Sequence, residues 1–370
     1  MGLTSITVLL SAVGLTVVLF IVTIRYWPRF AGRGWRAVSG RIGLLLVVQL
    51  ALFASVGLAV NRSFLFYGSW ADLLGQEKEP GVVVDHSAGS SRVRVVGRQQ
   101  LDVPAGSVPS AGGQIQNVVI AGEKSGISSR AYVYLPPQYF QSEYRNRTFP
   151  AAVVLTGYPG TAENLIKGLR YPKTAFQQAK DGRMQPMVLV MLRPTVAPPR
   201  DTECVDVPGG PQTETFLAED LPKAVSEAYR VGTEPRNWGV IGNSTGGYCA
   251  LKLALHHPGR FSAAAGLSAY YKAAEDPTTG DLFHGRKELR DRADLLWSLD
   301  RLPPVNASFL VTSSRHGEPN LAATRKFIEK VKAPGRVSSI LLDSGGHNFN
   351  TWRREVGPAL VWLSGRLSAS

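Results

Sequence analysis

Cysteine is scarce in this chain, which has only Cys204 and Cys249 among its 370 residues. Two cysteines cannot staple together a small disulfide-rich protein, and these two form no C-x-x-C motif for metal binding or redox chemistry. In an oxidising exterior they could pair and fix the loop around Cys204. The alternative is two separate buried thiols.

Acidic residues are absent from the first 62 positions, which contain six arginines. The rest of the net charge of +13, an excess of seven, is spread along the chain without a block of five or more like charges. A nucleic-acid-binding protein would gather its basic residues on one segment or surface. We therefore expect no nucleic-acid partner.

Two runs without any charged side chain occupy residues 5–24 and 42–60. Each has about 20 residues, enough to cross a hydrocarbon core of about 30 Å. A cleaved signal peptide usually begins with a charged region, which Met1–Thr4 lacks. Residues 1–62 are therefore predicted to form a transmembrane helical hairpin in the lipid bilayer. The alternative is a signal peptide followed by one anchor.

The segment between these runs, residues 25–41, carries five arginines. By the positive-inside rule such a short loop stays in the cytoplasm, so both termini would lie on the outer face. The sequence thus predicts a multi-pass protein of the cell membrane with its large C-terminal domain on the extracytoplasmic side. If the arginines serve only to bind anionic lipid, this orientation is unchanged.

Beyond the anchor, residues 63–115 are predicted as a linker and membrane-proximal segment, and residues 116–370 as one catalytic domain. Short apolar runs predict strands at 92–96, 117–122, 130–137, 151–157, 187–192, 238–242, 263–271, 307–314 and 338–343. Amphipathic stretches predict helices at 215–229, 246–256, 321–331 and 350–367. Strands that alternate with helices indicate an α/β fold with a mostly parallel sheet covered on both faces.

A G-x-S-x-G motif, Gly242-Asn243-Ser244-Thr245-Gly246, lies between a predicted buried strand and a predicted helix. This context is what a nucleophile elbow requires, because the serine occupies a tight turn whose neighbours must be small. Ser244 is therefore the candidate nucleophile. The alternative is a plain glycine-rich turn from strand to helix.

A serine hydroxyl needs a base, and His347 is the candidate, because it alone among the histidines lies between the last predicted strand and the last helix. The other histidines fall in the linker, far along the helix after Ser244, or in loops: His86, His256, His257, His284 and His316.

The acid that orients the histidine should follow a strand between Ser244 and His347. Glu318 meets this condition, whereas Asp300 precedes the strand and Asp343 ends the next one. Two N–H groups must bind the oxyanion of acyl transfer. The candidates are Thr245, and Tyr158 in the turn after the strand at 151–157, where the alternative is an ordinary β-turn.

From about residue 117 onward the chain resembles the esterase D-like branch of the α/β-hydrolases. The matching segments are YVYLPPQY, AAVVLTGYPG, TETFLAEDLPKAVSEAYRV, WGVIGNSTGGYCALKLALHHPGRF and GGHNFNTW. That branch includes S-formylglutathione hydrolases, feruloyl esterases and the secreted mycolyltransferases of mycobacteria, and the overall pattern is most similar to membrane-tethered esterases of actinobacteria. Where the family usually has His-Gly before the oxyanion turn, this chain has Thr156-Gly157.

These observations predict an α/β-hydrolase fold preceded by two transmembrane helices. The predicted function is an extracytoplasmic serine esterase or acyltransferase that acts on cell-envelope lipid or glycolipid esters, without a cofactor or metal. Two alternatives remain open: a catalytically silent scaffold or binding protein of the envelope, and a serine peptidase. Residues 280–303 are a candidate part of a lid.

Overall fold

The computed structural model describes residues 5–64, 92–196 and 200–369. The chain divides into two compact units, residues 1–80 and 81–370. The predicted membrane-proximal segment at 63–75 lies outside the described residues from position 65 onward.

The first unit consists of two long helices, α1 (Ile6–Tyr26) and α2 (Trp35–Phe64), joined through the short helix η1 (Trp27–Phe30). They contact each other through a hydrogen bond of 3.0 Å between the hydroxyls of Thr16 and Ser55. Most of their large apolar side chains are exposed. Both helices are long and apolar enough to cross a membrane, and a signal sequence near the N-terminus would have the same properties.

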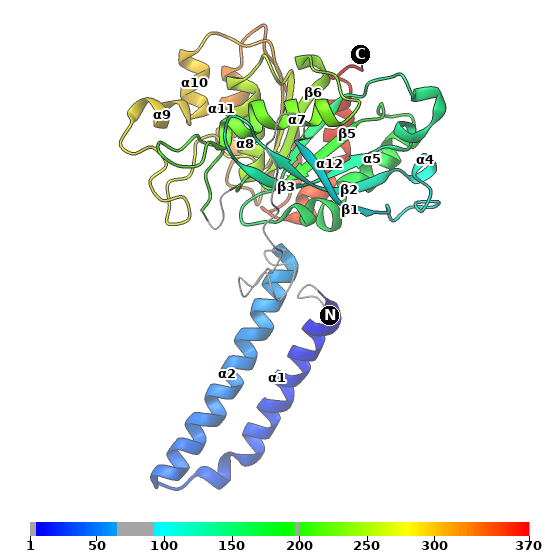
Figure 1. Ribbon diagram of the computed structural model, residues 1–370. Helices are drawn as coiled ribbons and strands as arrows, with labels where there is room; N and C mark the ends of the chain where they lie inside the picture. The colour runs from blue at the N-terminus through cyan, green and yellow to red at the C-terminus, as the bar shows by residue number, and fades with distance from the viewer. Residues whose placement is uncertain (1–4, 65–91, 197–199, 370) are drawn as a thin grey trace. The chain divides into compact units, whose positions relative to one another are not determined.

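The second unit is built on a nine-stranded sheet with the order β1-β2-β3-β5-β4-β6-β7-β8-β9 (Figure 1). The strands β5, β4, β6, β7, β8 and β9 run parallel, while β1, β2 and β3 form an antiparallel edge against β5. The bounds are β1 Val93–Gln99, β2 Gln114–Ala121, β3 Ser128–Leu135, β4 Ala151–Leu155, β5 Val188–Leu192, β6 Trp238–Asn243, β7 Ala263–Leu267, β8 Ser308–His316 and β9 Arg336–Ser344.

The sheet begins earlier than the predicted domain boundary at residue 116. Strand β1 lies inside the predicted linker, yet it pairs with β2 along almost its whole length, with a bulge between Val95 and Gly97. The sequence did place a strand at 92–96, but six of the seven residues of β1 are exposed or half-buried on an edge with few large apolar residues. A boundary based on apolar runs therefore fell one strand too late.

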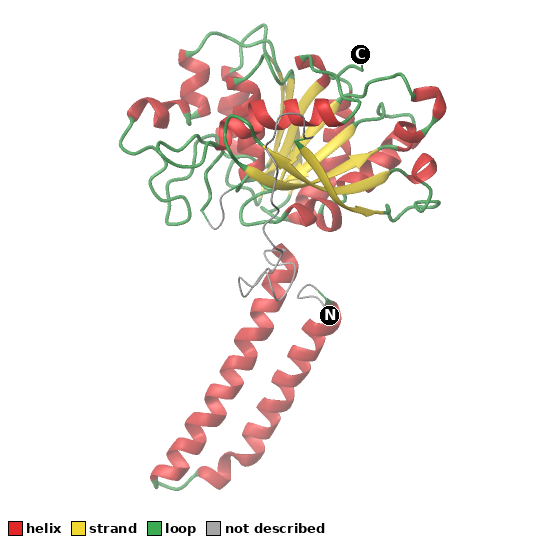
Figure 2. Ribbon diagram, in the orientation of Figure 1, coloured by secondary structure: helices red, strands yellow, loops and turns green. Residues whose placement is uncertain are grey.

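Helices flank both faces of this sheet (Figure 2). The longer ones are α5 (Tyr171–Lys180), α7 (Leu221–Ala228), α8 (Thr245–His256), α11 (Leu321–Lys330) and α12 (Phe349–Ser364). The shorter ones are α4 (Pro109–Gly112), η2 (Pro137–Phe140), η3 (Ser142–Tyr144), η4 (Asn164–Gly168), α6 (Thr213–Thr215), η5 (Phe216–Asp220), η6 (Pro235–Asn237), α9 (Lys287–Arg292) and α10 (Leu295–Arg301).

Two glycines of the central strand β6 let helices approach from opposite sides. A Cβ atom on Gly239 would lie 2.9 Å from Leu363 of α12, whereas one on Gly242 would lie 2.4 Å from the backbone of Gly246 in α8. Residues three apart in a strand point to opposite faces. Helices α8 and α12 therefore cover opposite faces of β6 and bring both their N-termini toward its carboxyl end.

The predicted lid segment, residues 280–303, contains α9 and α10 and is tied to α8. The Tyr248 hydroxyl donates to the carbonyl of Ala293, and the imidazole of His256 bonds the carbonyl of Arg292 at 3.0 Å. These contacts hold the segment against the side and the C-terminal end of α8.

Candidate active site

Ser244 stands alone between the end of β6 at Asn243 and the start of α8 at Thr245. Its backbone has φ 54° and ψ −122°, a region that non-glycine residues rarely occupy and that recurs at functional turns. The flanking glycines are needed, because a Cβ atom on Gly246 would lie 2.3 Å from the carbonyl oxygen of Leu155. This tight turn from strand to helix is the local geometry of a nucleophile elbow.

His347 lies against Ser244. Its Nε2 atom is 2.8 Å from Ser244 Oγ, across 103 residues of sequence. His347 belongs to the short loop between β9 and α12. Asn348 holds that loop in place, since its side chain accepts hydrogen bonds from the backbone N–H groups of Asn350 and Thr351. The ring of Trp352 packs edge-on against the imidazole at 5.1 Å.

Glu318 follows β8 and approaches the other side of the imidazole. Its Oε1 atom lies 3.7 Å from His347 Nδ1, which is ion-pair distance but longer than a hydrogen bond. The Glu318 side chain is fully buried, whereas 42% of the His347 side chain is exposed. Gly317 permits this approach with φ 96°, since a Cβ there would lie 2.6 Å from the carbonyl of Gly345.

Asp300 and Asp343, the two acidic residues not chosen as the triad acid, interact with other residues. Asp300 accepts hydrogen bonds of 2.6 and 2.5 Å from Lys330, and Asp343 is fully exposed and lies 3.5 Å from Arg315. The other described histidines also lie away from Ser244 or bond other groups. His256 bonds a backbone carbonyl, His257 bonds Glu214 at 2.7 Å, and His284 and His316 are exposed; His86 is outside the described residues.

The two predicted oxyanion donors belong to segments that flank the serine. Thr245 is the first residue of α8 and is buried. Tyr158 follows Gly157, where a Cβ atom would lie 2.9 Å from Ser244 Cβ, so this turn abuts the nucleophile. The turn is closed by a hydrogen bond of 2.9 Å from Gly160 N–H to the Gly157 carbonyl.

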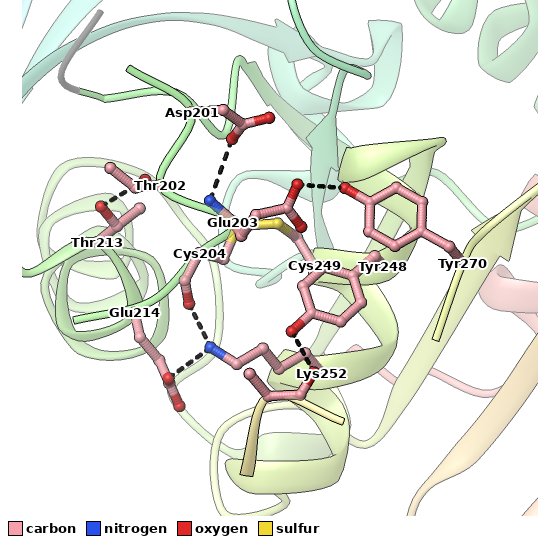
Figure 3. The surroundings of a disulfide bond; sticks show 11 residues. Asp201, Thr202, Glu203, Cys204, Thr213, Glu214, Tyr248, Cys249, Lys252 and Tyr270 are labelled. Carbon is pink, nitrogen blue, oxygen red and sulfur yellow. Dashed lines mark hydrogen bonds and ion pairs between the residues drawn. A yellow bond between two sulfur atoms is a disulfide. The ribbon is translucent and has the colours of Figure 1, made fainter. Parts of the chain in front are cut away.

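Cys204 and Cys249 form a disulfide with a Cα–Cα distance of 5.8 Å. It attaches the loop at 201–207 to α8, five residues beyond Ser244 (Figure 3). Beside it, buried Lys252 donates to the Cys204 carbonyl and to the carboxylate of Glu214 at 2.7 Å.

Glu214 is the centre of a buried charge network that the sequence did not indicate. It accepts hydrogen bonds from Lys252, from His257 at 2.7 Å and from Arg292 at 2.6 and 2.8 Å. Burial opposes its ionisation, but these cationic and hydrogen-bonding partners together hold its pKa well below the usual value. The network lies beyond the disulfide on α8 and joins this helix to α6 and α9.

Three further acidic residues are buried near the site and were also missed. Burial raises the pKa of Glu203 to about 8, with the charge of Asp201 adding to it, and raises the pKa of Asp201 itself to about 6. Burial likewise raises the pKa of Glu355 in α12 to about 8, and the charge of Glu318 contributes to that rise. Asp201 and Glu203 precede Cys204 in its loop, and Glu355 follows two arginines in α12. None of the three lies in a sequence motif that indicates a functional site.

Within the described ranges, no group of three or more histidine, cysteine, aspartate or glutamate side chains is arranged to hold a metal ion. What the residues around Ser244 offer is a serine hydroxyl, an imidazole in contact with it and a buried carboxyl behind the imidazole. Such a set can deprotonate the hydroxyl as it attacks a carbonyl carbon.

A family model described as "Putative esterase" matches residues 125–363, well over half of the chain. The chain belongs to this esterase family. The matched range includes β4, β6, α8 and the loop of His347. Family membership supports a hydrolase function of the esterase type, and the predicted resemblance to this family is confirmed.

Related proteins come from actinobacteria. An uncharacterised protein of Corynebacterium glutamicum is 27% identical over 281 residues, which cover 69% of this chain and 62% of that protein. The MPT51 antigen of Mycobacterium leprae is 35% identical over 114 residues, which cover 29% of this chain and 37% of the antigen. The chain therefore matches less than two thirds of the length of these relatives.

Solved structures with the same fold include a ferulic acid esterase, with a TM-score of 0.59 and 14% identity over 69% of this chain and 99% of that one. The S-formylglutathione hydrolase of Agrobacterium tumefaciens has a TM-score of 0.58 and 16% identity over 74% of this chain and 99% of the hydrolase. At these identities the likeness concerns the fold. The predicted α/β-hydrolase fold is confirmed, together with two apolar N-terminal helices that could span a membrane.

Proposed function

We propose that this member of the esterase family is an extracytoplasmic serine hydrolase or acyltransferase that works through an acyl-Ser244 intermediate. The observation that carries the proposal is the 2.8 Å hydrogen bond between Ser244 Oγ and His347 Nε2 at a strained elbow. A backbone strain of this kind persists only where the surrounding structure enforces it. Here it exposes the serine hydroxyl to an imidazole that can accept its proton.

The chemistry proceeds in two balanced halves. Ser244 Oγ attacks the ester carbonyl carbon while its proton passes to His347 Nε2, and the developing oxyanion is bound by backbone N–H groups of Thr245 and Tyr158. The ester C–O bond then breaks, and the alcohol leaves with the proton from His347. Glu318 stabilises the imidazolium that forms between these events.

In the second half, an acceptor hydroxyl attacks the acyl-serine and gives its proton to His347. The Ser244 ester bond breaks, and the serine recovers its proton. Water as acceptor makes the protein an esterase, and a sugar or lipid hydroxyl makes it an acyltransferase. No step requires a cofactor, because proton transfer and charge stabilisation suffice for acyl transfer.

The substrate class follows from the proposed location. Two membrane-spanning helices joined by an arginine-rich cytoplasmic loop would hold the catalytic unit at the outer face of the membrane. Lipid or glycolipid esters of the cell envelope are the esters concentrated there. Membership of an esterase family supports an ester as the bond that is cleaved.

The test is labelling of the full-length protein with a fluorophosphonate probe, read by intact mass. We expect one adduct on the wild-type protein, none on Ser244→Ala, and undiminished labelling of Ser226→Ala, a control whose hydroxyl bonds only the Gly232 carbonyl. Absence of an adduct on folded wild-type protein would instead favour a silent envelope scaffold. An adduct that survives Ser244→Ala would refute the nucleophile.

The substrate is tested by lipid analysis of cells that lack the protein. We expect an acylated envelope lipid or glycolipid to change in abundance, and wild-type but not Ser244→Ala protein to restore it. An unchanged lipid profile, combined with a normal fluorophosphonate adduct, would keep the serine hydrolase and reject the envelope-lipid substrate.

A further inference from the structure

The loop that carries Glu203 is held in a strained conformation next to the nucleophile helix. Glu203 and Cys204 both have positive φ values, 48° and 51°, although neither is glycine. Such conformations persist only when several contacts enforce them. Here the disulfide to Cys249 and the hydrogen bond from Lys252 to the Cys204 carbonyl do so, together with a bond of 3.1 Å from Glu203 N–H to Asp201 (Figure 3).

This conformation directs the carboxyl group of Glu203 toward Tyr270 (Figure 3). The Tyr270 hydroxyl donates a hydrogen bond of 2.6 Å to Glu203 Oε1. Glu203 is only 1% exposed, and within the described residues its Oε2 atom has no hydrogen-bond partner. Leaving a buried carboxyl incompletely paired is costly, so a position that only stabilises the fold would be better filled by an apolar residue.

Tyr270 connects this carboxyl to the turn of the nucleophile. It follows β7 at the carboxyl edge of the sheet, and its ring stacks on Tyr248 of α8 with centroids 5.1 Å apart. Tyr248 lies in the first turn of α8, where its backbone N–H donates a hydrogen bond of 3.0 Å to the Ser244 carbonyl. The contacts therefore run from Glu203 through the Tyr270 hydroxyl and ring to the turn of α8 that contains Thr245.

Thr245 is the residue after Ser244, and its backbone N–H is the proposed oxyanion donor. Tyr270 packs on Tyr248 in the same helical turn and can hold this first helical residue without touching the reacting atoms. A donor that is rigid before the reaction contributes more than one that must reorient during it. The packing of Tyr270 on this turn therefore bears directly on how well the oxyanion is bound.

We infer that Glu203 and Tyr270 are positioning residues, which act through the first turn of α8 to hold the oxyanion-binding N–H of Thr245 in place. This inference rests on the proposed function. The disulfide then has a specific role, because it fixes the loop from which Glu203 reaches Tyr270. The residues act on the reaction without contacting the substrate.

The protonation of Glu203 predicts a pH dependence of kcat. Burial, aided by the charge of Asp201, raises its pKa to about 8, while the hydrogen bond from Tyr270 and the charge of Lys252 lower it. Glu203 is therefore neutral at pH 7 and becomes negative above about pH 8. A negative charge on Glu203 opposes the negative oxyanion, so kcat should fall as pH rises through this range.

The groups that face Glu203 set the conditions of this test. They are Asp201 on its own loop, Tyr270 after β7, and Tyr248 and Lys252 on α8. Burial also raises the pKa of both tyrosines well above the usual value, so they stay protonated throughout a titration from pH 6 to 9.5. Lys252 is paired with Glu214 and is common to every variant compared.

The experiment uses the full-length protein in detergent with p-nitrophenyl butyrate as probe. We expect Tyr270→Phe to lower kcat about tenfold with little change in KM. The variant would displace the Thr245 N–H, which binds the oxyanion only in the transition state. The matched control is Tyr271→Phe, which removes a buried hydroxyl that bonds Thr324 at 3.0 Å instead. Equal kcat values for the two variants would overturn the inference.

Glu203 is tested through the pH profile of kcat. Glu203→Ala should lower kcat, Glu203→Gln should recover part of the loss by restoring a neutral acceptor for Tyr270, and neither should retain the alkaline fall near pH 8. An alkaline fall that persists in Glu203→Gln would overturn the inference. If the wild-type protein gives neither turnover nor an adduct on Ser244, the proposed function fails and the inference fails with it. A normal adduct with unaffected Glu203 and Tyr270 variants rejects the inference alone.

Discussion

His347 Nδ1 and Glu318 Oε1 lie 3.7 Å apart, with the carboxyl fully buried and the imidazole partly exposed. Within the described part of the chain, neither carboxyl oxygen of Glu318 has a hydrogen-bond partner. A carboxylate in this position has little to stabilise it other than the imidazolium that forms during the reaction. The separation is small enough to close to a hydrogen bond when the imidazole takes up a proton.

We therefore predict that Glu318→Gln lowers kcat by about 10²- to 10⁴-fold, because the amide cannot stabilise the imidazolium. The matched control is Asp343→Asn, which removes an exposed carboxylate that ends β9 and should leave kcat unchanged. The measurement is steady-state hydrolysis of p-nitrophenyl butyrate, with the fold checked by circular dichroism. A loss of activity in Asp343→Asn but not in Glu318→Gln would assign the role of the acid to Asp343 instead of Glu318.

The glycine after the nucleophile offers a second prediction. A Cβ atom on Gly246 would lie 2.3 Å from the Leu155 carbonyl oxygen and 2.5 Å from that of Thr156, and both are backbone atoms at the carboxyl end of β4. Gly246→Ala must push β4 and α8 apart, at a cost of about 1–3 kcal/mol or more. We expect a lower melting temperature and slower fluorophosphonate labelling.

The control for this change is Gly259→Ala, where an added Cβ meets nothing within 4 Å. It should match the wild-type protein in melting temperature and labelling rate. If Gly246→Ala behaves like this control, strand and helix are not packed as closely as the structure indicates.

The sequence revealed the parallel strands because they are buried on both faces. β4, β5 and β7 consist entirely of buried residues and appear as continuous apolar runs. The edge strand β1 gave a weaker pattern, since all its residues after Val93 are exposed or half-buried, and the domain boundary was misplaced there. The elbow was recognisable from Gly242 to Gly246 because its constraint is local.

The features that the sequence did not reveal depend on contacts between distant segments. Glu203 reaches Tyr270 across 67 residues, through a loop conformation that a disulfide fixes. Glu355 follows two arginines in α12 and has the composition of a surface turn, yet the helix turns this side chain inward. Local patterns of hydrophobicity contain no information about either contact.

The orientation in the membrane is a further prediction. A reporter enzyme that is active only outside the cytoplasm should work when it is fused after Ser370, and a fluorescent protein that matures only in the cytoplasm should stay dark there. The reverse pattern is expected for fusions within residues 31–34, between the two long helices. The intact mass of the purified protein separates two spans from a cleaved signal sequence, because cleavage would remove α1.

The last prediction concerns Glu355, which is fully buried in α12 and has a pKa raised to about 8, first by burial and then by the charge of Glu318. In the unfolded chain this carboxyl ionises near its ordinary value of about 4.3. Between these two values the folded protein keeps a proton that the unfolded chain has released. The contribution to stability is therefore complete below about pH 4 and is lost as pH rises toward 8, by about 1.4 kcal/mol for each pH unit.

Glu355→Gln removes this dependence, since an amide has the same shape and does not ionise. We expect the variant to melt above the wild-type protein at pH 8, with a difference that shrinks as the pH falls toward 5. Thermal unfolding of the full-length protein in detergent from pH 5 to 8.5 measures the difference, with Glu143→Gln, an exposed glutamate, as control. Parallel pH profiles for Glu355→Gln and the wild-type protein would mean that Glu355 is already ionised in the folded state. Its negative charge would then lie beside Glu318 and would have to be balanced by a cation or by water.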